Sequence, residues 1–119
     1  MKSLLLVAHG SRRTRSNDEI RTLTQAVAER AGDRFDLVDC AFLELAEPSI
    51  PDGIQGCIDR GATEVVVVPY FLSAGRHVVE DIPAEVRIKQ LQHPQIDIRI
   101  APYLGMHQGV PDLLLQAAG

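Results

Sequence analysis

Short apolar runs alternate with amphipathic segments along the chain. The runs cover residues 4–8, 36–43, 64–71 and 96–101, and they are rich in the aliphatic side chains that favour strands. Residues 65–68 are four consecutive valines, which is typical of a strand buried on both faces of a parallel sheet. We therefore predict four strands, one in each run.

Three amphipathic segments repeat their inward positions every three or four residues, which is the period of a helix. These positions are Ile20, Leu23, Thr24, Val27 and Ala31 in the first segment, Ile50, Ile54, Cys57 and Ile58 in the second, and Val110, Leu113, Leu114 and Ala117 in the last. A further helix is predicted from about Pro83, after a short turn that follows His77, because proline interrupts a helix interior. Each predicted strand is thus followed by a helix.

Local signals indicate where two of these helices begin and end. Residues 16–19, Ser-Asn-Asp-Glu, fit a capping box at the start of the first helix. Pro48 suits the first position of the second helix, where its missing N–H costs nothing. Gly61 can adopt the left-handed conformation that ends the same helix.

Strict alternation of strand and helix predicts an α/β fold, a four-stranded parallel sheet with right-handed crossovers and helices on both faces. The length suits one domain, so residues 1–119 are expected to form a single unit around this sheet. Ligands of such sheets bind beyond the carboxyl ends of the strands. Candidate functional residues are therefore those that directly follow each apolar run.

The composition argues against several classes of partner. The formal net charge of −4 disfavours a nucleic-acid surface, which normally carries a basic excess. No apolar stretch approaches transmembrane length, and the run at residues 4–7 is too short for a signal peptide. The sequence therefore predicts a cytoplasmic protein with no membrane partner. Cys40 and Cys57 lack a CxxC spacing and are expected to be buried, reduced thiols.

Residues able to bind metals and anions follow three of the predicted strands. They are His9, Gly10, Ser11, Arg12 and Arg13 after the first strand, Glu44 and Glu47 after the second, and Ser73, Gly75, Arg76 and His77 after the third. Because parallel strands end at the same edge, the two histidines are expected to meet there. Neutral imidazole binds cobalt, nickel, iron and zinc, and the lack of thiolates at this edge favours an open site over a closed structural one.

The other side chains near the strand ends each have two possible roles. Arg12, Arg13 and Arg76 either hold an anionic small molecule through charge-assisted hydrogen bonds or stay solvated in loops. Three aromatic side chains either flank a flat ligand or pack in the core: Tyr70, Phe71 and Tyr103. His93 and His107 lie near predicted turns, so they are expected to face solvent or to cap a helix.

Motifs of several common enzyme classes are missing. The chain has no GxxxxGK[ST] phosphate loop, no GxGxxG dinucleotide fingerprint and no GxSxG nucleophile elbow. Nucleotide hydrolysis, classical dinucleotide binding and α/β-hydrolase chemistry therefore lose support. A metal reaction at this edge is expected to run without ATP.

Three segments resemble the small sirohydrochlorin cobaltochelatases and ferrochelatases, which are class II chelatases. The segments are residues 5–12 (LLVAHGSR), 42–50 (FLELAEPSI) and 68–77 (VPYFLSAGRH), the last continuing to Asp-Ile-Pro at 81–83. They occur in the family's order and spacing over nearly the whole chain. The resemblance implies a chelatase-like half-domain that pairs as a homodimer to complete its cavity. It also implies that His9 and His77 bind the metal and that Glu44 is the acidic participant.

The function that this resemblance implies is ATP-independent insertion of a divalent metal into sirohydrochlorin, in cobalamin or sirohaem biosynthesis. Co²⁺ is the expected metal, with Fe²⁺ and Ni²⁺ as alternatives. The metal is a substrate, and no tightly bound cofactor is expected. Two imidazoles with free coordination positions suit this chemistry because the ion must be bound and then released to the ring. The residues expected to contact sirohydrochlorin are Ser11, Arg12, Arg13, Ser73, Gly75 and Arg76.

Two other functions stay open at the level of sequence. The same histidines can serve a carrier that binds cobalt or nickel without inserting it, and turnover with free sirohydrochlorin separates the two. A phosphoryl-transfer enzyme can use His9 as its nucleophile, with Arg12 and Arg13 as phosphate clamps. Ala8, however, stands where histidine phosphatases carry an arginine directly before the histidine.

Overall fold

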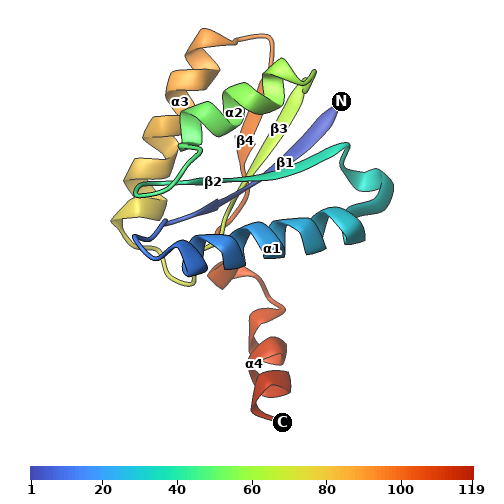
Figure 1. Ribbon diagram of the computed structural model, residues 1–119, viewed down its shortest axis with the longest axis vertical. Coiled ribbons are helices and arrows are strands. Elements are labelled where there is room, and N and C mark those ends of the chain that lie inside the picture. Colours follow the sequence, from blue (N-terminus) through green and yellow to red (C-terminus); the bar gives the residue numbers. More distant parts are fainter.

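Four parallel strands form one sheet, as the sequence predicts. The computed structural model describes residues 1–119, and its strands are β1 (Lys2–Ala8), β2 (Leu37–Phe42), β3 (Glu64–Pro69) and β4 (Asp97–Ile100). Their order is β2-β1-β3-β4, and every neighbouring pair is parallel (Figure 1). Because β1 lies between β2 and β3, the loops that follow these three strands are neighbours.

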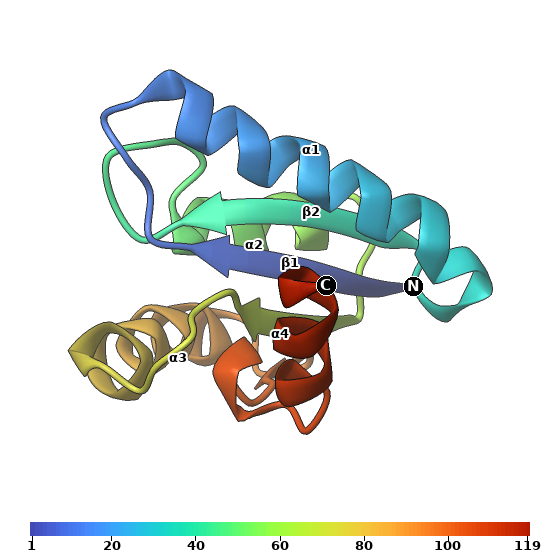
Figure 2. The same cartoon turned by 90° about the horizontal axis from the view of Figure 1, so that it is seen from below.

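Helices cover both faces of the sheet. These are α1 (Thr14–Ala31), α2 (Ile50–Asp59) and α3 (Ile82–Gln92). A fourth helix, α4 (Val110–Ala118), lies outside these layers, and the short turns η1 (Gly32–Arg34), η2 (His77–Asp81) and η3 (Leu104–Met106) join the elements in places. α1 and α3 lie on opposite sides of β1 (Figure 2), and α2 packs beside α3. The predicted α/β architecture is therefore confirmed.

Alternate residues of β1 serve two separate cores, because successive side chains of a strand point to opposite faces. Leu5 and Val7 are fully buried with Val65 and Val67 in the larger core, which α2 and α3 cover. Leu6 belongs to the smaller core on the α1 side. Burial of each such aliphatic side chain contributes roughly 1.5–3 kcal/mol, so β1 and β3 are the most firmly held strands and anchor the loops that follow them.

α1 begins before the predicted capping box, so that prediction is wrong. Its N-cap residue is Arg13, which makes no side-chain cap hydrogen bond. The backbone N–H groups of Ser16 and Asn17 donate to the carbonyl oxygen of Arg13 at 3.0 and 3.3 Å, which places residues 16–19 inside the helix. The Asn17 side chain is buried and turned toward the loop ahead of the helix, where it has a different function.

α2 starts later than Pro48, so the predicted start of this helix is also wrong. Ser49 is the N-cap residue, and its hydroxyl oxygen accepts a hydrogen bond from the backbone N–H of Asp52 at 3.2 Å. Serine at this position satisfies a free N–H group of the first turn, which proline cannot do. The predicted end is confirmed, because Gly61 follows the helix with φ +106°.

The short turn predicted after His77 is η2, a single π-helical turn. It leads directly into α3, which starts at Ile82. Pro83 lies in the first turn of α3, where no N–H group needs an intrahelical partner, as predicted.

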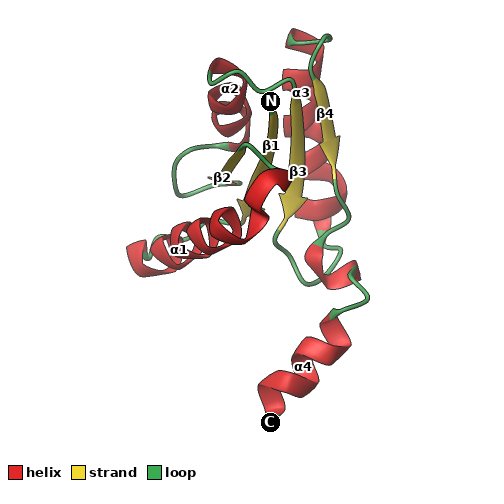
Figure 3. Ribbon diagram, turned by 90° about the vertical axis from the view of Figure 1, so that its right-hand side faces the viewer, coloured by secondary structure: helices red, strands yellow, loops and turns green.

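α4 forms at the predicted place but extends away from the sheet, as Figure 3 shows. None of its residues is buried, and the element it packs against is η3. Leu113, Leu114 and Leu115 are 57%, 66% and 71% exposed. No helix in the chain has the length and apolar character needed to cross a membrane.

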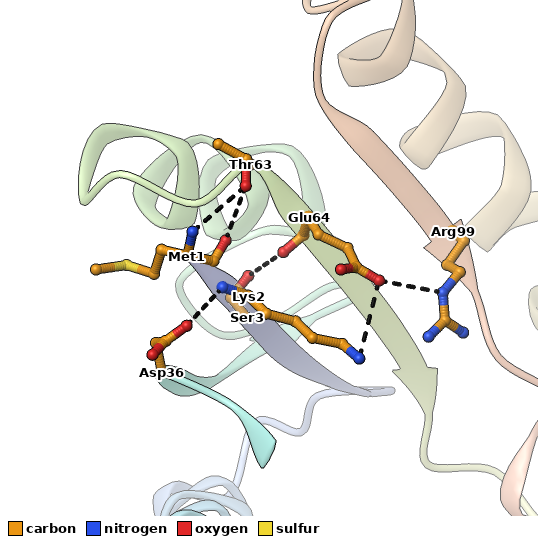
Figure 4. Close-up of polar contacts among 7 residues, drawn as sticks. All are labelled: Met1, Lys2, Ser3, Asp36, Thr63, Glu64 and Arg99. Atoms are coloured by element: carbon orange, nitrogen blue, oxygen red, sulfur yellow. Dashed lines mark hydrogen bonds and ion pairs between the residues drawn. The ribbon is translucent and has the colours of Figure 1, made fainter. Parts of the chain in front are cut away.

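The amino end of the sheet is held by polar contacts, which Figure 4 shows. The Glu64 carboxylate lies 3.9 Å from the Lys2 ammonium group and 3.8 Å from the Arg99 guanidinium group. The backbone N–H of Lys2 donates to the Asp36 carboxylate at 2.8 Å. Charges at this edge are therefore used in structural pairing, and the histidines lie at the opposite, carboxyl edge.

Candidate metal site

Backbone hydrogen bonds continue past the strand ends and align three loops. The N–H of Leu43 donates to the Ala8 carbonyl at 2.9 Å, and the N–H of Glu44 donates to the His9 carbonyl at 3.1 Å. On the other side of β1, the N–H of Tyr70 donates to the Val7 carbonyl at 2.8 Å. This alignment places His9 beside Glu44 at the carboxyl edge of the sheet.

The His9 ring faces an acceptor at each nitrogen. Its Nδ1 atom lies 3.2 Å from the carbonyl oxygen of Gly10, and its Nε2 atom lies 3.2 Å from Oε1 of Glu44. A neutral imidazole carries one proton, so the ring can donate a hydrogen bond to only one of these two acceptors. A cation between Nε2 and Glu44, either a proton or a metal ion, completes this arrangement.

His77 comes from the loop after β3 and lies against His9. The centroids of the two rings are 4.8 Å apart, and the ring planes are inclined by 51°. Its Nδ1 atom lies 2.7 Å from Oδ2 of Asp81. Both imidazoles are partly exposed, with 44% of the His9 side chain and 45% of the His77 side chain accessible to solvent. An ion can therefore reach both rings.

The spacing of the two rings suits a shared metal ion. Metal bonds to imidazole nitrogen are about 2.1 Å long, so two rings on one tetrahedral ion have centroids on the order of 5 Å apart. The observed 4.8 Å agrees with this value. The structure contains no group of three or more His, Cys, Asp or Glu side chains arranged to hold a metal ion. The candidate site is thus two imidazoles with the Glu44 carboxylate at one side.

Gly10 makes the close approach of the first two loops possible. Its φ of +93° is in the left-handed region, and a Cβ atom at this position would collide with the carbonyl oxygen of Glu44. Leu45 is the one non-glycine residue with a positive φ, at 65°, and it directly follows Glu44. Strained backbone of this kind is concentrated at functional sites, where surrounding contacts hold it in place.

Asn17 fixes the loop between His9 and α1. Its Oδ1 atom accepts a hydrogen bond from the backbone N–H of Ser11 at 3.0 Å, and its Nδ2 atom donates to the Ser11 carbonyl at 2.8 Å. This contact was not predicted from the sequence, because Asn17 falls within the predicted capping box. A usable signal was present, since Asn17 lies on the same helical face as Ile20 and Thr24, which is the face predicted to point inward.

A cavity of about 300 Å³ lies beside His9. Its lining includes Gly10, Ser11, Ile20 and Tyr70. Tyr70 is 42% exposed and lines both this cavity and a neighbouring apolar groove. Phe71, in contrast, packs against the larger core. Of the two aromatic side chains after β3, Tyr70 is the one placed to flank a ligand.

The chain was compared with models of known protein families. A family model described as CbiX matches residues 3–119. The chain belongs to the CbiX family. This match confirms the resemblance to small chelatases that the three sequence segments indicate.

Curated relatives of this CbiX chain are chelatases. The sirohydrochlorin ferrochelatase of Priestia megaterium is 34% identical over 120 residues, which cover 98% of the chain and 43% of that protein. The sirohydrochlorin cobaltochelatase of Methanocaldococcus jannaschii is 40% identical over 83 residues, which cover 70% of the chain and 57% of that protein. The chain thus spans about half the length of the curated relatives it matches.

The CbiX fold is also found in a metal complex. The structure of the sirohydrochlorin chelatase SirB from Bacillus subtilis subspecies spizizenii in complex with cobalt matches with a TM-score of 0.87 and 29% identity. The match covers 99% of this chain and 50% of that chain. It confirms the chelatase-like architecture of the half-domain.

The predicted substrate contacts of this CbiX chain surround the histidines but differ in their local structure. Ser11 lines the cavity, and its hydroxyl oxygen accepts a hydrogen bond from the Arg13 N–H at 3.0 Å. The side chains of Arg12, Arg13, Ser73 and Arg76 are exposed, and Arg76 lies 3.6 Å from the Glu80 carboxylate. Gly75 has no positive φ and has open space where a Cβ would lie, so its conformation does not require glycine.

The other histidines and the cysteines have structural contacts instead. His93 Nε2 lies 3.0 Å from the Gln55 side-chain oxygen, and His107 Nδ1 accepts a hydrogen bond from the Gly109 N–H at 2.9 Å, just before α4. Cys40 and Cys57 are free and buried, as predicted. Burial raises the pKa of both thiols, which keeps them neutral and makes them poor metal ligands.

Proposed function

We propose that this CbiX chain inserts a divalent metal ion into sirohydrochlorin without ATP. The observation that carries the proposal is the His9–His77 pair, whose rings lie 4.8 Å apart at the ligand-binding edge of the sheet. Ferrochelatases and cobaltochelatases of sirohydrochlorin among the relatives support the choice of substrate. The metal is a substrate in this proposal, and residues 1–119 act as one chelatase-like domain in the cytoplasm.

The proposed roles follow from what metal insertion requires. The incoming ion must lose water and exchange protein ligands for the ring nitrogens, while two pyrrole N–H protons leave. His9 and His77 bind the ion through Nε2 and leave its other coordination positions free for the ring. Glu44, with Oε1 3.2 Å from His9 Nε2, accepts a pyrrole proton or helps to transfer the ion. Release is possible because two imidazoles hold an ion less tightly than a closed set of four ligands.

Exposed arginines next to the histidines supply the proposed contacts to the substrate. Sirohydrochlorin carries carboxylates at its periphery, and guanidinium groups bind carboxylates through paired, charge-assisted hydrogen bonds. Arg12 and Arg13 make no ion pair within the chain and are therefore free to do so, whereas Arg76 must exchange Glu80 for the substrate. The same proposal includes polar contacts from Ser11, Ser73 and the Gly75 backbone.

A homodimer is the proposed assembly, with α4 of each copy packing on the other. Two exposed apolar surfaces of the chain support this assembly. The exposed leucines of α4 offer one apolar surface. A groove of about 280 Å³ along α1 offers the other, and its seven lining residues are all hydrophobic: Leu4, Leu6, Leu23, Val27, Val68, Tyr70 and Leu104.

An absorbance assay with purified protein and free sirohydrochlorin tests the function. Co²⁺, Fe²⁺ and Ni²⁺ are supplied separately, and each rate is compared with the spontaneous rate, because imidazole ligands alone do not select among these ions. The expected result is acceleration with Co²⁺, the proposed physiological metal, without ATP. Metal binding without acceleration for any of the three ions would make the chain a carrier and contradict the proposed enzyme.

A further inference from the structure

A carboxylate lies directly behind one of the two candidate metal-binding rings. Oδ2 of Asp81 is 2.7 Å from Nδ1 of His77, the shortest side-chain contact made by either histidine of the pair. The Asp81 side chain is 39% exposed, so the contact is partly screened from water by the protein. His9 has no such partner at Nδ1, where it faces the Gly10 carbonyl oxygen at 3.2 Å.

The backbone of η2 determines this contact. His77 and Asp81 are the first and last residues of the π-helical turn, which the N–H of Ile82 closes by donating to the His77 carbonyl. Pro83 follows and has no N–H to donate, so a regular α-helical bond from residue 83 back into this turn cannot form. The turn therefore brings both side chains to the same face and keeps them there when α3 begins.

The chemistry of the contact selects one form of His77. An ionised carboxylate only accepts hydrogen bonds, so the Nδ1 atom of His77 must carry the proton. The Nε2 atom of a neutral ring then has a free lone pair, which is the form that binds metal. The same hydrogen bond restricts rotation of the ring about its Cβ–Cγ bond. Carboxylates behind metal-bound histidines have this effect generally.

We propose that Asp81 is a positioning residue for metal insertion, which fixes the tautomer and orientation of His77. The catalytic consequence of this inference rests on the proposed function. The effect of Asp81 on the His77 ring does not depend on turnover. Asp81 does not touch the ring nitrogens of the substrate in this role. It acts through His77 alone.

Asp81→Asn is the sharpest test, because asparagine keeps the size of the side chain but can offer an N–H donor to Nδ1. His77 can then carry its proton on Nε2, the nitrogen needed for the metal. Glu80→Gln is the matched control, since it removes the same charge from the same turn at a side chain that contacts Arg76 and not His77. Asp81→Glu is the conservative variant, which retains an acceptor.

Nitrogen-15 NMR of the imidazole ring reads the tautomer directly, and calorimetry with Co²⁺ reads binding. Asp81→Asn is expected to reduce the share of the Nδ1–H tautomer and to weaken Co²⁺ binding and kcat by roughly 10- to 100-fold. The KM for sirohydrochlorin should change little. Glu80→Gln should match the wild type in tautomer, Co²⁺ affinity and kcat, and only its KM for sirohydrochlorin should fall, because Arg76 loses its ion-pair partner. Asp81→Glu should recover at least part of the loss. Circular dichroism spectra identify any variant that is misfolded.

The outcomes separate this inference from the proposed function. An unchanged tautomer and Co²⁺ affinity in Asp81→Asn would overturn the positioning role. Weakened Co²⁺ binding with the Nδ1–H tautomer retained would make Asp81 a direct ligand, which also overturns it. If the wild type shows no chelatase activity, the proposed function fails, while the tautomer and Co²⁺ measurements still decide the effect of Asp81 on His77.

Discussion

Gly10 lies so close to the backbone of Glu44 that no side chain fits between the two loops. Gly10→Ala combines this collision with a left-handed φ, and should lower the free energy of unfolding by about 1–3 kcal/mol. It should also separate Glu44 from His9 and reduce insertion activity. Urea denaturation and the absorbance assay measure the two effects. Gly56→Ala is the control, since a Cβ there meets nothing within 4 Å and the change should be neutral or stabilising.

His77→Ala should abolish most of the insertion activity, because it removes one of the two proposed metal ligands. The loss in kcat/KM should exceed the roughly 10–100-fold that follows removal of an outer-sphere partner. The circular dichroism spectrum and the oligomer mass should stay unchanged, as the ring is partly exposed. His93→Ala, whose ring contacts Gln55 instead, should keep normal turnover. Near-normal turnover of His77→Ala would rule out the ligand assignment.

Insertion activity should fall on the acid side of neutrality. A protonated imidazole has no lone pair for the metal, so protonation of either histidine removes a metal ligand. Initial rates measured at constant metal and sirohydrochlorin concentrations between about pH 5 and 8 provide the test. A rate that stays level across this range would be incompatible with delivery by histidine.

Protein stability should fall at alkaline pH through the buried thiols. Burial raises the pKa of Cys40 and Cys57 in the folded chain, whereas thiols of the unfolded chain ionise near about pH 8.5. As the pH rises, the thiols therefore lose their protons first in the unfolded state. The contribution of the neutral thiols to the free energy of unfolding is fully present below the unfolded-state pKa, and it is lost as the pH rises through the raised pKa values of the folded state. Urea midpoints between about pH 7 and 10 measure the slope. Cys57→Ala should have a shallower slope, and an equal slope would contradict this origin.

Charges on the apolar side of α4 should prevent assembly. Leu113→Glu with Leu114→Glu places two carboxylates on the apolar face of α4, where burial of an unpaired charge is costly. Light scattering should report a dimer for the wild type and a monomer for this variant. Leu91→Glu changes an exposed leucine on α3, so it should remain dimeric. A monomeric wild type, or a dimer that persists in the α4 variant, would refute the proposed assembly.

The sheet and the meeting of His9, Glu44 and His77 were predictable because both depend on patterns that hold over short stretches. Apolar runs define strands, and the alternation with helices makes the strands parallel. Parallel strands in turn bring the residues after them to one edge. The three side chains needed no long-range information beyond this, and the structure brings them together as expected.

The errors and omissions fall where a specific side-chain contact or a local backbone turn decides the structure. Residues 16–19 match a capping box, but the hydrogen bonds between Asn17 and Ser11 fix the loop and α1 starts earlier. Asp81 stands in the continuation of the third segment, and its spacing from His77 allows a contact on a helix, yet the orientation of the His77 ring depends on the π-helical turn. The exposure of α4 was not predictable, because its apolar residues repeat with the same period as those of a helix that packs against a sheet.

η3 rests on the loop that leads from β3 to His77. The N–H of Gly105 donates to the Phe71 carbonyl at 2.9 Å, and the Leu72 backbone leaves no room for a Cβ on Gly105. Since α4 continues from η3, a force on α4 is transmitted to the segment that carries the second imidazole. In the proposed homodimer, the partner's contacts with α4 would therefore act on the same segment that carries His77.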